Sequence, residues 1–225
     1  YRRVDDFIGE IYSLAPPEAL FMMISDHGFT RLKSHVYLNY WLSENGYLFC
    51  DAPEPEGFQS LDGRSRAFAL DPSRIYTHLK GRFARGAVAP GRDYESLREQ
   101  LRERNSHMAV EIPVSPLDPT AVCAVLPILN VHRKEEIYHG SFLSAAPDLV
   151  LEAAPGFDLK GTPRTRHIAD KKDFTGMHTR TDAFLYLRGV PGPFPQPVRI
   201  VDCLPTILKA LHVSAGDHFD GRPLM

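Results

Sequence analysis

Cysteine is scarce in this sequence, and it has neither a long apolar run nor a strong excess of one charge. The three cysteines are far apart and form no CxxC pair, which argues against a disulfide framework, a structural zinc site or a thiol redox motif. No apolar run approaches the roughly 20 residues that cross a bilayer, so we expect no membrane segment in this portion. A formal net charge of -2 gives no broad basic field for a nucleic-acid backbone. We therefore do not expect a nucleic-acid polymer as the partner.

The remaining composition is that of an ordinary globular protein. Hydrophobic residues make up 43% of the 225 residues and charged residues 24%, which leaves room for one sizeable core, with or without an inserted lobe. The first ten residues, YRRVDDFIGE, are charged and unlike a signal peptide. Localisation stays open, with a soluble, cytoplasmic protein favoured, and the sequence does not indicate an oligomeric state.

The first 50 residues have the pattern of a core α/β unit. Apolar residues at spacings of three and four predict a helix that ends at Pro16 and Pro17. The run ALFMMIS, Ala19 to Ser25, predicts a strand buried on both faces, as in a parallel sheet. Asp26, His27 and Gly28 then form a loop at the strand's carboxyl end, where α/β sheets bind ligands. A second helix is predicted from His35 to Asn45, with Gly46 as its cap.

The rest of the sequence predicts an inserted lobe followed by a return to the core. Residues 51–131 are interpreted as a small α+β lobe and residues 132–225 as the return. In the lobe we predict strands at Arg66–Leu70 and Ile75–Leu79 and a helix from Asp93, as N-cap, to Glu103. In the return we predict strands at Asp148–Ala153 and Ala183–Leu187, an exposed loop at Pro155–Asp173, and a helix from Asp202 to Leu211 with its apolar face on the sheet.

Asp26 and His27 carry the clearest chemical signal. A carboxylate and a neutral imidazole suit zinc, manganese or iron, so the pair does not fix the metal. Gly28 allows the backbone to turn tightly beside a ligand. Taken alone, an Asp-His-Gly triplet after a strand is more often a plain turn than a metal site.

Several segments together resemble one known family. The segment SDHGF after the apolar strand is similar to a signature of the alkaline phosphatase superfamily, in its type I phosphodiesterase and nucleotide pyrophosphatase branch. The segments YRRVDDFIGEIYSL, VYLNYWLSENGYL, RSRAFALDPSRIYTHLKGR, EEIYHGSFLSAAPDLVLEAAPGFDLKG, TGMHTRTDAFLYLRG and VDCLPTILKALHVSAGDHFDGRPL resemble successive parts of the predicted phosphohydrolase and phosphomutase group of that branch. This resemblance covers nearly the whole chain.

The resemblance implies the C-terminal part of an alkaline-phosphatase-like α/β fold with a sheet flanked by helices. It also implies two divalent metal ions, zinc or alternatively manganese. Asp26 and His27 would bind the ion shared with the nucleophile, and His178 would bind the other. The family's nucleophile and remaining ligands are expected upstream of residue 1, so this portion alone should be inactive.

The expected activity is hydrolysis of a phosphodiester or nucleotide pyrophosphate. A phosphomutase or phosphotransferase of the same superfamily, and a non-catalytic binding fragment, stay open as alternatives. His139, Lys160, Arg164 and His167 are candidate contacts to substrate, because they are cationic or titratable and lie in turns or a charged loop. Such residues are more often solvated surface groups.

Overall fold

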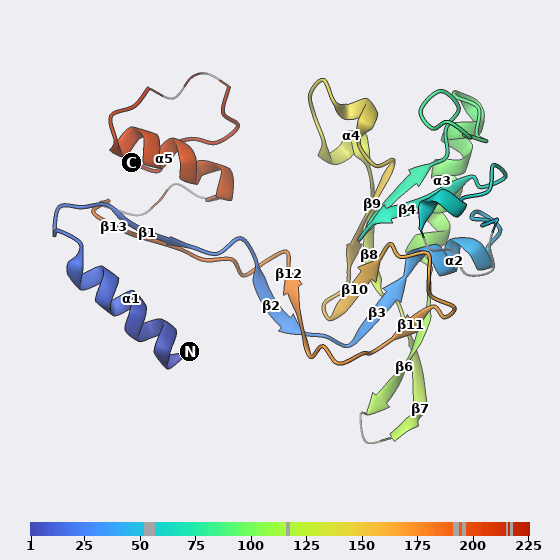
Figure 1. Cartoon of the computed structure of the whole chain (residues 1–225), viewed down its shortest axis with the longest axis horizontal. Helices are drawn as coiled ribbons and strands as arrows, with labels where there is room; N and C mark the ends of the chain where they lie inside the picture. The colour runs from blue at the N-terminus through green and yellow to red at the C-terminus, as the bar shows by residue number, and fades with distance from the viewer. Residues whose placement is uncertain (52–56, 116–117, 191–193, 195–196, 215, 217) are drawn as a thin grey trace. The chain divides into compact units, whose positions relative to one another are not determined.

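The computed structural model describes residues 1–51, 57–115, 118–190, 194, 197–214, 216 and 218–225. The chain divides into two compact units (Figure 1). One unit contains Tyr1–Phe29 and His178–Met225, and the other contains Thr30–Met177. Both units contain helices and strands, and the strands form several small sheets, so the fold is mixed α/β. No helix in the described part of the chain is both long and apolar enough to span a bilayer.

The first unit begins with helix α1, Arg2–Leu14, and the strand β1, Phe21–Ile24. β1 pairs antiparallel with β13, Leu185–Arg188, in a two-stranded sheet and is only half-buried. Prediction of the strand is confirmed, but its predicted burial in a parallel sheet is wrong. Among the described residues, β1 has a neighbouring strand on one side only. Its apolar side chains are therefore less buried than its composition predicted.

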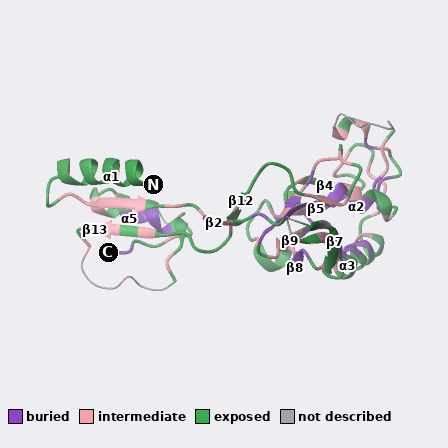
Figure 2. Ribbon diagram, turned by 90° about the horizontal axis from the view of Figure 1, so that it is seen from below, coloured by how far each residue is buried: buried purple, intermediate pink, exposed green. Residues whose placement is uncertain are grey.

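Contacts with Arg188 hold α1 against this sheet. The Arg188 guanidinium lies 4.3 Å from the centre of the Tyr12 ring and donates a hydrogen bond of 3.1 Å to the Pro16 carbonyl. The ring of Tyr12 also meets Phe21 edge to face, with the centroids 5.2 Å apart. The predicted apolar stripe of α1 is nevertheless exposed, and none of its residues is buried (Figure 2).

The C-terminal part of this unit contains the 3-10 turn η3, Ile200–Asp202, and helix α5, Cys203–Ala210. Asp202 occupies the predicted N-cap position, but its buried carboxylate accepts the backbone N–H groups of Arg199 and Arg222 instead, at 2.8 and 2.9 Å. The prediction that the apolar face of this helix packs on the sheet is wrong. Cys203, Pro205 and Thr206 are buried, whereas Leu204, Ile207 and Leu211 are exposed.

Two short strands continue the chain across the boundary between the units. β2, Gly28–Arg31, pairs with β12, Gly176–Thr179. The boundary falls within both strands, because residues 28–29 and 178–179 belong to the first unit.

The second unit is built around a four-stranded sheet with the order β4-β5-β9-β8. Its strands are β4 at Ala67–Asp71, β5 at Arg74–Thr77, β8 at Ile128–Arg133 and β9 at Leu149–Ala153. Helix α2, Leu38–Glu44, and helix α3, Arg92–Ser106, pack leucines into the core that this sheet carries. α2 begins later than predicted, because residues 35–37 belong to a strand, and the N-cap of α3 is Gly91 rather than Asp93.

The smaller strands of this unit include a hairpin, a parallel pair and a short helical turn. β6, Val110–Ser115, pairs with β7, Asp118–Val125. β3, Ser34–Tyr37, pairs in parallel with β10, Phe157–Lys160, and antiparallel with β11, Ala169–Asp170. The turns η1, Phe58–Ser60, and η2, Leu143–Ala145, and the short helix α4, Lys134–Ile137, complete the unit.

Predicting Pro155–Asp173 as one exposed loop was therefore wrong, because β10 buries Phe157 and Leu159 between its polar residues. Residues 52–56 of the predicted lobe lie outside the described residues. Residues 51–131 lie within the second unit, and β8 and β9 pair around the end of that range. The division at residues 51 and 131 stays a prediction.

A buried carboxylate, Asp148, connects the elements of the second unit. It accepts the backbone N–H of Thr77 at 2.7 Å and the hydroxyl of Tyr94 at 2.6 Å. It also pairs with Arg82 at 3.1 Å and Lys134 at 3.0 Å. Burial, and the hydrogen bond to this carboxylate, raise the pKa of Tyr94. Asp148 thus satisfies two cations and holds β5, α3 and α4 together.

Candidate functional site

Asp26, His27 and His178 all lie in the first unit. Asp26 and His27 follow β1 directly, and His178 is in β12. The rings of His27 and His178 are stacked, with their centroids 3.7 Å apart and their planes 18° apart. Nε2 of His27 lies 3.4 Å from Oδ1 of Asp26. The structure thus brings together three side chains that are separated by up to 152 positions in the sequence.

Phe29 completes the surroundings of the two imidazoles. Its ring meets His27 and His178 edge to face, with centroid distances of 5.1 and 5.3 Å. The Asp26 side chain is 76% exposed and that of His27 is 25% exposed. The carboxylate is therefore open to a ligand, while the imidazole of His27 is held in place by its neighbours.

The hydrogen bond of His27 fixes which ring nitrogen is free. Nδ1 lies 3.0 Å from the Gly28 carbonyl oxygen, which accepts only, so Nδ1 carries the proton. In the neutral imidazole, Nε2 then turns a lone pair toward the Asp26 carboxylate 3.4 Å away. A cation or a proton between Nε2 of His27 and the Asp26 carboxylate would stabilise these two acceptors.

Asp26 and His27 fit a divalent metal ion in donor type and spacing. Bonds from zinc to nitrogen or oxygen are about 2.0–2.2 Å long, so two ligands of one ion lie roughly 3–3.5 Å apart. A backbone carbonyl that accepts the N–H of a ligating histidine is the usual support for such a ligand. The neutral imidazole is the form of histidine that binds metals. Among the residues described, no three His, Cys, Asp or Glu side chains lie close enough together to hold one metal ion.

Gly28, next to His27, allows β2 to approach the end of β12 and the segment after it closely, rather than providing a turn. A Cβ at this position would lie 2.5 Å from both Oγ1 of Thr179 and the carbonyl oxygen of Thr181. Gly28 is buried in β2, and its φ is not positive. The predicted role of this glycine in a tight turn is therefore wrong, since its missing side chain makes room for the neighbouring segment.

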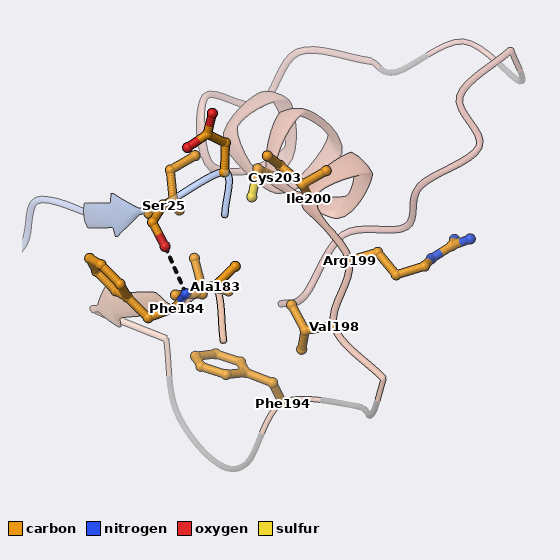
Figure 3. A pocket seen from close by; sticks show the side chains of 11 residues that line it. Ser25, Ala183, Phe184, Phe194, Val198, Arg199, Ile200 and Cys203 are labelled. Atoms are coloured by element: carbon orange, nitrogen blue, oxygen red, sulfur yellow. Dashed lines mark hydrogen bonds between the residues drawn. The ribbon is translucent and has the colours of Figure 1, made fainter. Parts of the chain in front are cut away.

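A pocket of about 320 Å³ borders Asp26 (Figure 3). Ser25 fixes one wall, because its Oγ accepts the N–H of Phe184 at 2.9 Å and its own N–H donates to the Phe184 carbonyl at 3.0 Å. The Arg199 side chain extends away from the other residues shown in Figure 3 and donates to the Asp220 carbonyl at 2.8 Å. The lining is mainly apolar and consists of Ile24, Ser25, Asp26, Ala183, Phe184, Leu185, Phe194, Val198, Arg199, Ile200 and Cys203.

Sequence reasoning missed this pocket. Ser25 adjoins Asp26 in the SDHGF segment and carried a usable signal. Phe194 and Val198 lie in a Pro-rich stretch without periodicity, so nothing in the pattern pointed to them.

The four predicted substrate contacts all lie in the second unit. Lys160 pairs with Asp158 at 2.6 Å, and Nε2 of His167 lies 2.8 Å from Oδ2 of Asp170. His139 is exposed in the turn after α4. Arg164 is exposed in the segment between β10 and β11, where its backbone N–H donates to Thr162. Their contact with substrate stays a prediction.

Burial would raise the pKa of the Asp170 carboxyl, but hydrogen bonds from His167 and Tyr37 outweigh it and lower that pKa. Asp170 is therefore an ionised partner for His167 at neutral pH. The pairing orients the imidazole and reduces its availability to a phosphate.

Comparison with known proteins identifies the family. The family model described as type I phosphodiesterase / nucleotide pyrophosphatase matches residues 1–180, a range that includes Asp26, His27 and His178. This match covers well over half of the 225 residues, and the chain belongs to that family. No curated protein and no solved structure matches the chain significantly.

Proposed function

Because the chain belongs to the type I phosphodiesterase / nucleotide pyrophosphatase family, we propose that it is part of a metal-dependent phosphodiesterase. In this proposal Asp26, His27 and His178 are metal ligands. The supporting observation is their arrangement, in which His27 lies 3.4 Å from the Asp26 carboxylate and stacks on His178 at 3.7 Å. The substrate class is a small phosphodiester or a nucleotide pyrophosphate.

Each ligand has a distinct place in the proposal. Asp26 and His27 hold one ion and His178 holds the second, with zinc as the expected metal and manganese as the alternative. Bound together, two such ions activate a nucleophilic hydroxyl and stabilise the leaving oxygen. The Gly28 carbonyl keeps the Nδ1 proton of His27 in place and so presents Nε2 to the ion.

The pocket beside Asp26, most of whose lining residues are apolar, supports a role in substrate binding. Its volume of about 320 Å³ suits a small organic group rather than a polymer. Phe184 and Phe194 contribute aromatic surface to its wall, and Asp26 borders it. A phosphoester bound by the metal ions would place one of its organic substituents there.

The proposal assigns the nucleophile and the remaining metal ligands to residues outside this chain. The three ligands present cannot complete two coordination shells, since zinc takes four ligands in most sites. The alkaline-phosphatase-like sheet flanked by helices is part of the same proposal. We expect the 225 residues alone to bind zinc weakly and to hydrolyse little.

Metal affinity tests the ligand assignment without relying on activity. Zinc titrated into the chain by isothermal calorimetry should bind, and Asp26→Asn, His27→Gln and His178→Gln should each weaken binding by roughly tenfold or more. His107→Gln is the matched control, because His107 is an exposed histidine at the C-terminal end of α3. Equal zinc affinity in all four variants would refute the assignment.

Activity tests the reaction class. A polypeptide that carries these residues together with an upstream nucleophile should hydrolyse a phosphodiester faster than a phosphomonoester, and only with added zinc or manganese. Chromatography of the products should show free alcohol and phosphomonoester. Transfer of the phosphoryl group to a second substrate hydroxyl would instead support a phosphotransferase.

A further inference from the structure

The second unit contains a cavity that the proposed metal site does not use. It has a volume of about 320 Å³ and lies between α2, the segment that follows α2, and the segment between β10 and β11. Tyr40, Ser43 and Thr165 line it together with several charged residues. This cavity is therefore more polar in character than the pocket beside Asp26.

Two of the charges in the lining are neutralised by partners outside it. Arg64 binds Asp62 with two nitrogens, Nε at 3.0 Å and Nη2 at 2.7 Å from Oδ2. Hydrogen bonds from Arg64 lower the pKa of Asp62 to about 2, so this carboxylate is ionised. Asp51 pairs with Arg85 at 3.2 Å. Neither Arg64 nor Asp51 leaves a full charge for a ligand.

Two charges of opposite sign remain. Arg166 and Glu44 have no ion pair with each other or with any other residue that the structure describes. Burial raises the pKa of the neighbouring Cys50 thiol, which therefore adds no charge to the cavity at neutral pH. The free charge of the lining is thus one guanidinium and one carboxylate.

Thr165 also lines the cavity, but its hydroxyl is not open to it. Its Oγ1 is buried and has no hydrogen-bond partner among the described residues. A ligand in the cavity therefore does not reach this oxygen, and Arg166 is the group of the lining that attracts an anion.

We propose that this cavity binds a small zwitterion, with its anionic group at Arg166 and its ammonium group at Glu44. Arg166 would attract a simple anion while Glu44 would repel it. A simple cation would be attracted by Glu44 and repelled by Arg166. Only a ligand that carries both charges gains from both side chains. The proposal uses none of the residues of the metal site and is independent of the proposed function.

The test compares three probes of nearly equal size in metal-free buffer. These are 2-aminoethylphosphonate, which carries both charges, ethylphosphonate, which lacks the ammonium group, and ethylamine, which lacks the anion. Their carbon–phosphorus bonds are not phosphoesters, so turnover cannot obscure binding. Titration of the 225-residue chain followed by amide chemical shifts should show that 2-aminoethylphosphonate binds roughly tenfold tighter than either single-charge probe.

Two variants assign the charges. Arg166→Gln should weaken binding of both phosphonates, whereas Glu44→Gln should weaken 2-aminoethylphosphonate and strengthen ethylphosphonate by removing repulsion. The matched controls Arg92→Gln and Glu103→Gln lie on α3 outside the cavity and should change nothing. The proposal is overturned if the three probes bind equally, if none binds, or if Glu44→Gln affects both phosphonates alike.

Discussion

Gly28→Ala tests how the histidines are brought together. The new Cβ would lie 2.5 Å from Oγ1 of Thr179 and from the Thr181 carbonyl oxygen, and 2.9 Å from Cβ of Asp182. The Thr179 side chain can rotate away only by breaking its 2.6 Å hydrogen bond to Thr181. The carbonyl oxygen belongs to the backbone, so the strand itself has to shift.

The expected cost follows from these contacts. Overpacking costs about 1–3 kcal/mol and the lost hydrogen bond about 1 kcal/mol. Alanine restricts the unfolded chain more than glycine does, which offsets this cost by roughly 0.4–1 kcal/mol. We expect a net loss of about 1–3 kcal/mol in the free energy of unfolding of the first unit, together with separation of the stacked imidazoles.

Gly9→Ala is the matched control, because Gly9 lies within α1 and a Cβ there would meet nothing within 4 Å. It should stabilise the helix by roughly 0.5–1 kcal/mol. Denaturant unfolding gives the two energies, and nuclear Overhauser contacts between the ring protons of His27 and His178 report the stack. Adding Thr179→Ala to Gly28→Ala should restore stability only in part, since the Thr181 carbonyl stays in place. Unchanged stability and intact ring contacts in Gly28→Ala would refute the reasoning.

Two further predictions concern buried carboxylates. Asp148→Asn should lower the free energy of unfolding of the second unit by about 3–5 kcal/mol, because it leaves the cations of Arg82 and Lys134 without a buried counter-charge; a loss below 1 kcal/mol in chemical denaturation would contradict this. Backbone N–H groups of Arg222 and Arg199 lower the pKa of Asp202 in the folded state, so its stabilisation is present above its unfolded pKa of about 3.9 and is lost as pH falls. The unfolding free energy of the native chain should therefore fall more steeply below about pH 5 than that of Asp202→Asn, and parallel pH profiles would disprove the link.

Local patterns predicted the positions of several elements, even where their burial does not follow their composition. Strands β4, β9 and β13 and helices α1, α3 and α5 lie close to their expected places. β10 was missed because its two buried residues alternate with Asp158 and Lys160 inside a charged, glycine-containing stretch. The buried face of α5 was missed because its apolar stripe is exposed, while its small and polar residues are buried.

The candidate site could be predicted from the sequence only through family resemblance. No periodicity relates His27 to His178, since their contact depends on the pairing of β2 with β12. The orientation of the His27 ring is equally hidden, because it depends on the position of a single carbonyl oxygen, that of Gly28. Residue type therefore indicated the metal chemistry, and the fold supplied the geometry.

Imidazole nitrogen resonances test the central claim most directly. Zinc added to the ¹⁵N-labelled chain should shift Nε2 of His27 strongly while Nδ1 keeps its proton, and should also perturb His178. Asp26→Asn should reduce the zinc-induced shift of His27 more than that of His178, because the proposal assigns the two histidines to different ions. Resonances of both rings that do not respond to zinc, with the shifts appearing at other histidines, would contradict the account.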